Sequence, residues 1–437
     1  MFKRIENFFE FSKYNTNFRQ EIIAGITTFL SMAYIIIVNP KILEVAGIPF
    51  GPSMVATILI SFIGTFLMGV YAKRPFAIAP YMGENAFIAF TVCKVLGYSW
   101  QKALGAIFIS GVLFTILTLT KLRKMLVEAV PKSLKVSFIV GIGFFLAFIG
   151  LNEIGIVTVG VKGAPVKPGN LTSPEVLLGI LGFFIVIYLF IKKVKSALLI
   201  GIIAVTFLSF IMGINPFPEK IFSLPPNISE IFLKLDIKGA LNWDFFPIIL
   251  TVLVLDFIDT MGTLIGVSYR AGFLDKDGNL PEIEKPMLCD SLSTIFASLL
   301  GTTTAGVFIE SATGIEAGGR TGFTAIITSI LFLLALFFAP LFYSVPSYAY
   351  GIALIVVGMI MISAVTQLDF DDLTELVPSF VVIILMSFTY NIGIGMTAGF
   401  VAYPICKIFK GEFKKVPKPM LILSAVSLLF FIFYPYH

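Results

Sequence analysis

Two apolar segments of this chain, each interrupted by glycine or proline, carry a similar sequence in the two halves. Residues 79–87 read APYMGENAF and residues 305–313 read AGVFIESAT, and aligning them places Glu84 on Glu310, about 226 residues later. Each segment therefore sets one carboxylate among apolar neighbours beside a break in a helix. Paired, discontinuous membrane segments in the two halves of a chain are typical of the binding site of a secondary transporter.

The composition requires a membrane around these segments. Of the 437 residues, 57% are hydrophobic and only 13% are charged, whereas a soluble domain has about 25% charged residues. Fifteen apolar segments follow one another along the whole chain, two of them broken: 22–39, 53–71, 75–96 (broken), 101–120, 135–152, 174–191, 196–213, 244–268, 286–301, 303–319 (broken), 321–342, 346–365, 375–390, 392–409 and 418–435. We predict an all-α polytopic membrane protein with about 14 transmembrane segments. Either the last segment does not span, or an earlier one is re-entrant.

Lysine and arginine residues set the orientation of the chain. If the N-terminus is cytoplasmic, the basic residues that follow every second span fall on the same side, as the positive-inside rule requires. They are Lys3, Arg4, Lys13 and Arg19, then Lys73 and Arg74, then Lys121, Arg123, Lys124 and Lys132, then Lys192, Lys193 and Lys195, and finally Lys407, Lys410, Lys414, Lys415 and Lys418. The longer loops 153–173 and 214–243 are then external. A net charge of +5 divided among short loops does not indicate nucleic-acid binding.

The two halves also resemble each other outside the broken segments. The run at 101–120 is similar to the run at 321–342, and the run at 135–152 is similar to the run at 346–365. Because seven spans is an odd number, the second half must be inverted relative to the first, with a two-fold axis in the membrane plane. The predicted organisation is an amphipathic cytoplasmic N-terminus lying on the membrane surface (1–21), a first repeat (22–213), an external loop (214–243), a second repeat (244–410) and a C-terminal apolar segment (411–437).

Ionisable residues inside apolar spans are costly and usually functional. Five carboxylates lie well inside the predicted spans, namely Glu84, Asp256, Asp259, Asp290 and Glu310. Asp256 and Asp259 are three residues apart, which places them on one face of a helix. Two such carboxylates cannot both ionise freely, and proton coupling requires a carboxyl group that binds and releases a proton near neutral pH. The alternative is a structural residue that only makes a hydrogen bond, and this alternative is strongest for Asp290.

The breaks have a physical use. Exposed backbone groups are tolerated inside a membrane only beside a cavity, where they can bind a ligand rich in hydrogen-bonding edges. The extended parts, 75–82 and 303–309, would lead into half-helices whose N-termini offer free N–H groups and a positive dipole. Glu84 and Glu310 then lie in the first helical turn. A role limited to capping is the alternative, above all for Glu84.

Metal and enzyme chemistry find little support in the residue types. The three cysteines, Cys93, Cys289 and Cys406, lack the spacing of metal ligands. The single histidine is the terminal residue, His437, which argues against a serine–histidine enzyme. We therefore predict no metal, no cofactor and no catalytic residues.

Several stretches of the chain resemble one family of transporters. They are EIIAGITTFL at 21–30, VNP at 38–40, MGENA at 82–86, DTMGT at 259–263, IESA at 309–312 and EAGGRTG at 316–322. These stretches are similar to the AzgA-like purine permeases of the nucleobase–cation symporter-2 (nucleobase–ascorbate transporter) family. The resemblance implies fourteen spans in two inverted repeats, with a core domain (spans 1–4 and 8–11) and a gate domain (spans 5–7 and 12–14). It also implies proton-coupled uptake of hypoxanthine, guanine or adenine into the cell, through the cell membrane, and dimers formed by the gate domain.

By the same resemblance, Asn85, Asp256 and Glu310 match the positions that bind the purine, and Asp259 matches a position that is important for transport. Asp256 and Asp259 are our candidates for ion coupling, and the coupling ion is H⁺ or Na⁺. Glu84 departs from the family, which usually has leucine there. We add Glu84 and Ser311 to the candidate substrate-binding residues because of their places in the two segments.

Three other functions compete with this interpretation. An anion carrier of the same fold would favour positive charge between the half-helices, where this chain has carboxylates. A passive channel would not need matched breaks in inverted repeats. A transporter of uracil or xanthine on the same fold stays open, although the uracil-type relatives place on the eighth span a histidine that this chain lacks.

Overall fold

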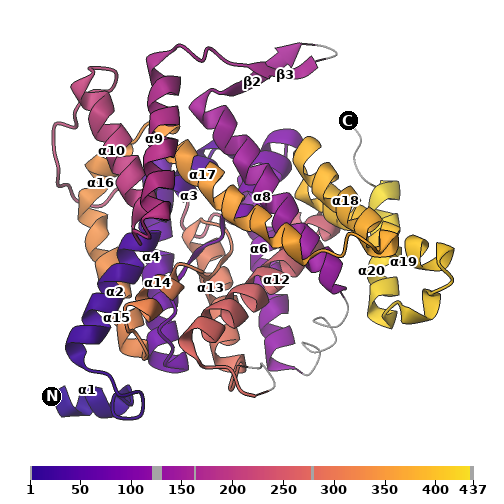
Figure 1. Cartoon of the computed structure of the whole chain (residues 1–437), viewed down its shortest axis with the longest axis horizontal. Helices are drawn as coiled ribbons and strands as arrows, with labels where there is room; N and C mark the ends of the chain where they lie inside the picture. Colours follow the sequence, from indigo (N-terminus) through magenta and orange to yellow (C-terminus); the bar gives the residue numbers. More distant parts are fainter. Residues whose placement is uncertain (1, 121–129, 162–163, 277–279, 434–437) are drawn as a thin grey trace.

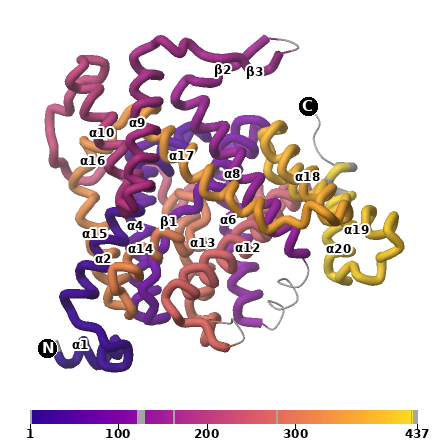
Figure 2. Tube along the Cα trace, viewed as in Figure 1, coloured from indigo at the N-terminus to yellow at the C-terminus, as the bar shows by residue number. Residues whose placement is uncertain are grey.

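The computed structural model describes residues 2–120, 130–161, 164–276 and 280–433. Lys121, Arg123, Lys124 and His437, which entered the predictions above, lie outside the described residues. Figures 1 and 2 show a bundle of helices with the N-terminal helix and the C-terminal helix at opposite edges.

The first half begins with the N-terminal helix and ends with a pair of long helices. Its helices are α1 (Phe2–Phe8), α2 (Phe18–Met32), α3 (Ile35–Val45), α4 (Phe50–Leu67), the π-helix η1 (Met68–Ala72), α5 (Met82–Ala86), the π-helix η2 (Phe87–Val95), α6 (Trp100–Leu119), α8 (Lys132–Ile154), α9 (Pro174–Ile191) and α10 (Ala197–Ile211). Its strands are β1 (Ile78–Pro80), β2 (Val157–Val161) and β3 (Ala164–Pro168).

The second half follows the short helix α11 (Ile237–Ala240). Its elements are the 3₁₀-helix η3 (Trp243–Phe245), α12 (Phe246–Ala271), α13 (Glu284–Leu300), strand β4 (Ala305–Val307), α14 (Ser311–Glu316), α15 (Gly322–Ala335), η4 (Leu336–Phe338), α16 (Ala339–Tyr343), α17 (Ser347–Ile362), η5 (Ser363–Gln367), α18 (Leu373–Phe388), α19 (Ile392–Phe409), η6 (Phe413–Lys415) and α20 (Lys418–Phe433). Within the described part of the chain, nine helical stretches are long and apolar enough to cross a membrane, and three apolar helices are shorter.

The two predicted breaks meet at the centre of the molecule. Strands β1 and β4 pair in antiparallel fashion, with Ala79 opposite Gly306 and Pro80 opposite Ala305. All six strand residues are buried. Each strand leads within a few residues into a half-helix, α5 in the first half and α14 in the second. The non-helical backbone of each half is thus hydrogen-bonded to that of the other half. This pairing satisfies backbone N–H and C=O groups that lipid could not satisfy.

Glycines let helices α8 and α17 approach closely (Figure 1). A Cβ atom at Gly150 would lie 2.6 Å from the carbonyl oxygen of Gly351, and one at Gly143 would lie 2.8 Å from that of Gly358. Small residues at a helix interface allow such backbone contact in membrane proteins. These helices are the predicted spans 5 and 12, so equivalent spans of the two halves pack against each other.

Two parts of the structure differ from what the sequence indicated. The loop 153–173, which we predict to be external, contains the hairpin β2–β3. The N-terminal helix covers only Phe2–Phe8, and Phe9 and Phe11 are buried with their rings 5.6 and 5.8 Å from that of Phe323. Packing of these rings on α15 stabilises the protein more than an extension of the amphipathic helix would.

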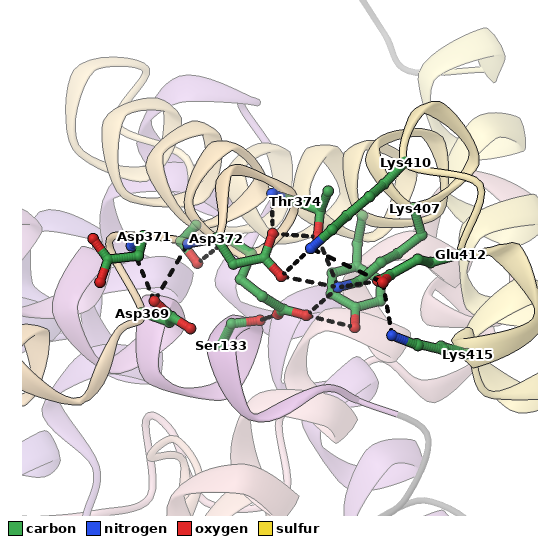
Figure 3. Close-up of polar contacts among 12 residues, drawn as sticks. Ser133, Asp369, Asp371, Asp372, Thr374, Lys407, Lys410, Glu412 and Lys415 are labelled. Carbon is green, nitrogen blue, oxygen red and sulfur yellow. Dashed lines mark hydrogen bonds and ion pairs between the residues drawn. The ribbon is translucent and has the colours of Figure 1, made fainter.

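A polar cluster joins α8, α18 and α19 (Figure 3). The side chain of Lys407 is only 5% exposed, and its Nζ lies 2.6 Å from Glu375 Oε1 and 2.8 Å from Thr374 Oγ1. Glu375 also accepts hydrogen bonds from Tyr403, at 3.1 Å, and from Ser133 at the start of α8. We call this group of five residues the Lys407 cluster. The Lys407 ammonium joins α19 to α18, and the Glu375 carboxylate joins α18 to α8.

Candidate functional site

Asn85 lies in the half-helix α5 and connects three segments. Its side chain is fully buried, its Nδ2 donates to Asn39 Oδ1 on α3, and its Oδ1 accepts from Thr303 just before β4. Asn39 in turn donates to Thr57 and Thr302, at 2.7 and 3.0 Å. An asparagine amide has two N–H groups and two acceptor lone pairs. These two contacts therefore leave Asn85 with one N–H group and one lone pair for a ligand.

Asp256 and Asp259 lie one turn apart on α12, as the spacing predicted. Asp256 is fully buried; its Oδ2 accepts from Thr294 at 2.9 Å, while Oδ1 has no hydrogen-bond partner among the described residues. Asp259 is partly exposed and lies beside Glu84. Helix α12 packs against both half-helices, α5 and α14. Oδ1 of Asp256 is thus a hydrogen-bond acceptor inside the bundle that is available to a ligand.

Glu84 does not act as a helix cap. It is fully buried, and neither carboxyl oxygen has a hydrogen-bond partner in the described part of the chain. Its charge would instead be repelled by the nearby carboxyl groups of Asp259, Asp256 and Asp290. We call these four residues the carboxyl cluster. Unpaired buried carboxylates are expensive, so the capping alternative does not account for Glu84.

Asp290 has the structural role that was its stronger alternative. Its Oδ1 accepts from the backbone N–H of Val307 at 2.7 Å, and its Oδ2 accepts from the hydroxyl of Thr260. Both carboxyl oxygens of Asp290 therefore have a hydrogen-bond partner, one on α12 and one on the broken segment. Asp290 fixes strand β4 against the helix that carries Asp256.

Glu310 is the N-cap residue of α14, yet its side chain makes no capping bond. Instead its Oε1 accepts a hydrogen bond of 2.5 Å from the hydroxyl of Tyr34, a fully buried residue between α2 and α3. Glu310 itself is partly exposed. Glu84 is the third residue of its half-helix, so the two glutamates that aligned in sequence are not equivalent in structure.

Ser311 and two aromatic rings complete the crossing, the place where the two broken segments meet through strands β1 and β4. The hydroxyl of Ser311 accepts from the backbone N–H of Ala77 at 2.9 Å, which fastens α14 to the start of β1. The rings of Tyr81 and Phe308 are stacked, with centroids 6.4 Å apart and planes 9° from parallel. Aromatic faces of this kind suit a flat ring as ligand.

The structure therefore brings the predicted residues to one crossing but divides them into three groups. Asp256, Asp259 and Glu84 lie together, Asn85 joins Asn39, and Glu310 joins Tyr34. No hydrogen bond links these three groups directly to one another among the described residues. Sequence reasoning missed the partners Tyr34 and Asn39, although Asn39 stands in the VNP stretch that carries the family resemblance.

Glu21 is a further buried carboxylate that the sequence analysis did not single out. It lies in the first turn of α2 and accepts from the backbone N–H groups of Arg320, Thr321 and Thr324, at 3.0, 3.3 and 3.2 Å. It also accepts from the hydroxyls of Thr321 and Thr324, at 2.9 and 2.6 Å. A carboxylate at the N-terminus of α15 satisfies donors that have no partner within the helix. The EIIAGITTFL stretch thus begins with a residue that holds the turn after α14.

We expect Glu21→Gln to lower the free energy of unfolding by about 1–3 kcal/mol, because the amide presents N–H groups to donors that need an acceptor. Thermal unfolding of the purified protein measures this change. Glu44→Gln is the matched control, since Glu44 is 49% exposed and pairs with Lys41 at the surface. Equal melting temperatures for the two variants would contradict the role given to Glu21.

Known proteins resemble the chain over almost its whole length. A model of the family described as "Permease family" (Xan_ur_permease) matches residues 19–430. A relative named as a permease in Methanocaldococcus jannaschii is 48% identical, with 99% of each chain covered. The guanine/hypoxanthine permease PbuG of Bacillus subtilis is 40% identical over 98% of this chain and 100% of the relative. The adenine permease AdeP of Escherichia coli is 38% identical over 99% of this chain and 97% of the relative.

The fold recurs in a solved structure of low sequence identity. The transmembrane domain of the cyanobacterial bicarbonate transporter BicA superposes with a TM-score of 0.65 at 16% identity, covering 88% of this chain and 98% of that chain. This fold has two inverted repeats of seven helices, so the predicted fold class is confirmed. The molecule is a multi-pass protein of the cell membrane.

Proposed function

The chain belongs to this permease family, and we propose that it imports purine nucleobases (hypoxanthine, guanine or adenine) by proton symport with alternating access. The proposal depends on one observation. Carboxyl oxygens of Glu84 and Asp256 that have no hydrogen-bond partner among the described residues, and the Asn85 amide with one N–H group and one lone pair still available, surround the crossing of the two broken helices. The similar permeases that are named for adenine and for guanine/hypoxanthine support the substrate class.

In the proposed binding mode the purine lies between α5 and α14. The ring and exocyclic N–H groups donate to Glu310 and to the free Oδ1 of Asp256. Asn85 contributes its remaining N–H group and lone pair, and the rings of Tyr81 and Phe308 offer aromatic faces. Ser311, whose hydroxyl already accepts from the backbone of Ala77, would act mainly by holding the two segments together.

Coupling to protons is assigned to the carboxyl cluster. Among the described residues no ion pair joins a lysine or arginine to Glu84, Asp256 or Asp259, so nothing there offsets three neighbouring negative charges. Carboxyl groups in such a place are neutralised by protons rather than left ionised. Asp259 and Glu84 are the proposed proton carriers, and Asp256 connects them with the purine. These two carboxyl groups would bind protons at pH 7 and release them on the cytoplasmic side, which would complete the transport cycle.

We expect Asp259→Asn to abolish accumulation driven by a pH gradient while purine binding stays within about threefold of the wild type. A gradient of one pH unit supplies about 1.4 kcal/mol per coupled proton, which supports an about tenfold accumulation. In the variant the ratio of internal to external purine should fall to about one. Glu84→Gln serves as the comparison, and unchanged accumulation in both variants would remove the carboxyl cluster from coupling.

A carrier of anions is the main competing function, because the solved bicarbonate transporter BicA shares the fold. An anion would have to bind beside Glu84, Asp256 and Asp259, with no described cation paired to them. The site therefore favours a neutral ligand with N–H donors. Coupling to Na⁺ stays an open alternative to H⁺, and dimerisation through the gate domain stays a prediction of the family resemblance.

Uptake into proteoliposomes tests the function. Radiolabelled hypoxanthine, guanine, adenine, uracil and bicarbonate would be compared with and without an inward proton gradient, and with a sodium gradient as the alternative. We expect saturable uptake of at least one purine that rises with the proton gradient. Uptake of uracil or bicarbonate alone would overturn the proposal.

A further inference from the structure

We propose that Tyr34 is a positioning residue that sets the choice among purines by holding one oxygen of Glu310. This inference rests on the proposed function, because it names the residue that orients the acceptor for the purine. The observation behind it is the 2.5 Å hydrogen bond from the Tyr34 hydroxyl to Glu310 Oε1.

The place of Tyr34 is fixed by its backbone. The residue lies between α2 and α3, and its carbonyl oxygen accepts from the N–H groups of Ile37 and Val38, at 3.1 and 3.0 Å. Its side chain is fully buried. A hydroxyl on a buried ring with a pinned backbone has little freedom to leave its acceptor.

The segment that carries Glu310 is fastened to the same helix pair. Thr313 on α14 donates to Ser31 at 2.9 Å, and Gly314 packs so closely on Thr28 of α2 that a side chain would not fit. The Glu310 side chain makes no capping bond to α14 and extends to Tyr34 instead. The orientation of this carboxylate is thus determined by Tyr34 and not by the half-helix.

The consequence for a purine follows from the number of acceptor sites. A carboxylate can accept two parallel N–H donors, one on each oxygen. The Tyr34 hydroxyl occupies part of Oε1 and leaves Oε2 as the stronger acceptor. A ligand that offers one N–H group, as the N1–H edge of hypoxanthine does, loses little affinity when the Tyr34 hydroxyl occupies part of Oε1. Guanine offers an adjacent N1–H group and exocyclic amine, and it cannot use both oxygens fully.

Removal of the hydroxyl should therefore change selectivity and not only affinity. In Tyr34→Phe the carboxylate loses its orientation, which weakens both purines, but Oε1 becomes free for the second donor of guanine. We expect the ratio of the dissociation constants, hypoxanthine over guanine, to rise about tenfold, which is less than the effect of a whole hydrogen bond to a charged group because the Tyr34 hydroxyl occupies only part of Oε1.

The experiment is a double-mutant cycle on the purified protein. Binding of radiolabelled hypoxanthine and guanine would be measured for the wild type, Tyr34→Phe, Glu310→Gln and the double variant. Tyr350→Phe is the matched control, since Tyr350 donates to Glu153 at 2.5 Å on α17 and α8, away from the crossing. The ratio should rise in Tyr34→Phe, stay constant in Tyr350→Phe, and not change further when Tyr34→Phe is added to Glu310→Gln.

An unchanged ratio, or an equal shift in the Glu310→Gln background, would overturn the role of Tyr34 while leaving the purine site intact. Failure of the wild type to bind any purine would instead refute the proposed function. If Tyr34→Phe does not fold, difluorotyrosine at position 34 replaces it. The stronger donor should then move the ratio in the opposite direction, and no movement would count against the proposal.

Discussion

Replacing Glu310 by glutamine is expected to weaken purine binding about 30- to 150-fold without unfolding the protein. The amide has a single oxygen. If that oxygen accepts from Tyr34, at present 2.5 Å from Oε1, the NH₂ group faces the N–H donors of the purine. If it turns to the purine, the buried Tyr34 hydroxyl loses its acceptor. Hydrogen bonds to charged groups contribute about 2–3 kcal/mol, which corresponds to the stated loss of affinity.

Equilibrium binding of the best purine to the purified variant measures this loss, and thermal unfolding shows that the fold is kept. Glu316→Gln is the matched control on the same half-helix, because Glu316 is 48% exposed and pairs with Arg270 at 2.6 Å. We expect the control to bind as the wild type does. Wild-type affinity in Glu310→Gln would take Glu310 out of the binding site.

Replacing Lys407 by methionine should cause the largest loss of stability of the variants considered. The substitution leaves Glu375 without its cation, although Ser133 and Tyr403 still donate to it. Removing one partner of a buried ion pair costs about 3–5 kcal/mol. Because the Glu375 side chain is 23% exposed, solvent reduces the cost, and we expect a value toward the lower end of that range.

Thermal unfolding in detergent, followed by near-UV circular dichroism, would measure the effect. Lys410→Met is the control, since Lys410 is 45% exposed and pairs with Asp372 at 3.0 Å. A surface pair of this kind contributes about 0–1 kcal/mol. The double variant Lys407→Met/Glu375→Gln should recover part of the loss. Equal destabilisation by the Lys407 and Lys410 substitutions would mean that burial of the Lys407 cluster is not what matters.

The helices were the part of this fold that the sequence could predict. Apolar runs have a length fixed by the bilayer, and the predicted runs 174–191 and 392–409 coincide with α9 and α19 to the residue. The breaks were also predictable, because proline and glycine interrupt the first segment and glycine interrupts the second. The three-residue strands β1 and β4 were not, since so short a pairing leaves no periodic pattern in the sequence.

Candidate residues were easier to predict than their partners. A carboxylate in an apolar span is conspicuous by its cost, and five were identified this way, whereas Glu21, just before a predicted span, was missed. Whether such a group is free depends on residues far away in sequence. Asp290 turned out to hold Val307, Glu310 to accept from Tyr34, and Glu84 to lie unpaired. Sequence spacing within one helix carries no information on these contacts.

The most direct measurement is a cryo-electron microscopy structure of the protein with the purine that it takes up best. We expect density for the purine between α5 and α14, with an N–H group of the ligand within hydrogen-bond distance of Glu310 and another near Asp256. Purine density elsewhere in the molecule, with the crossing of β1 and β4 unoccupied, would contradict the site proposed here.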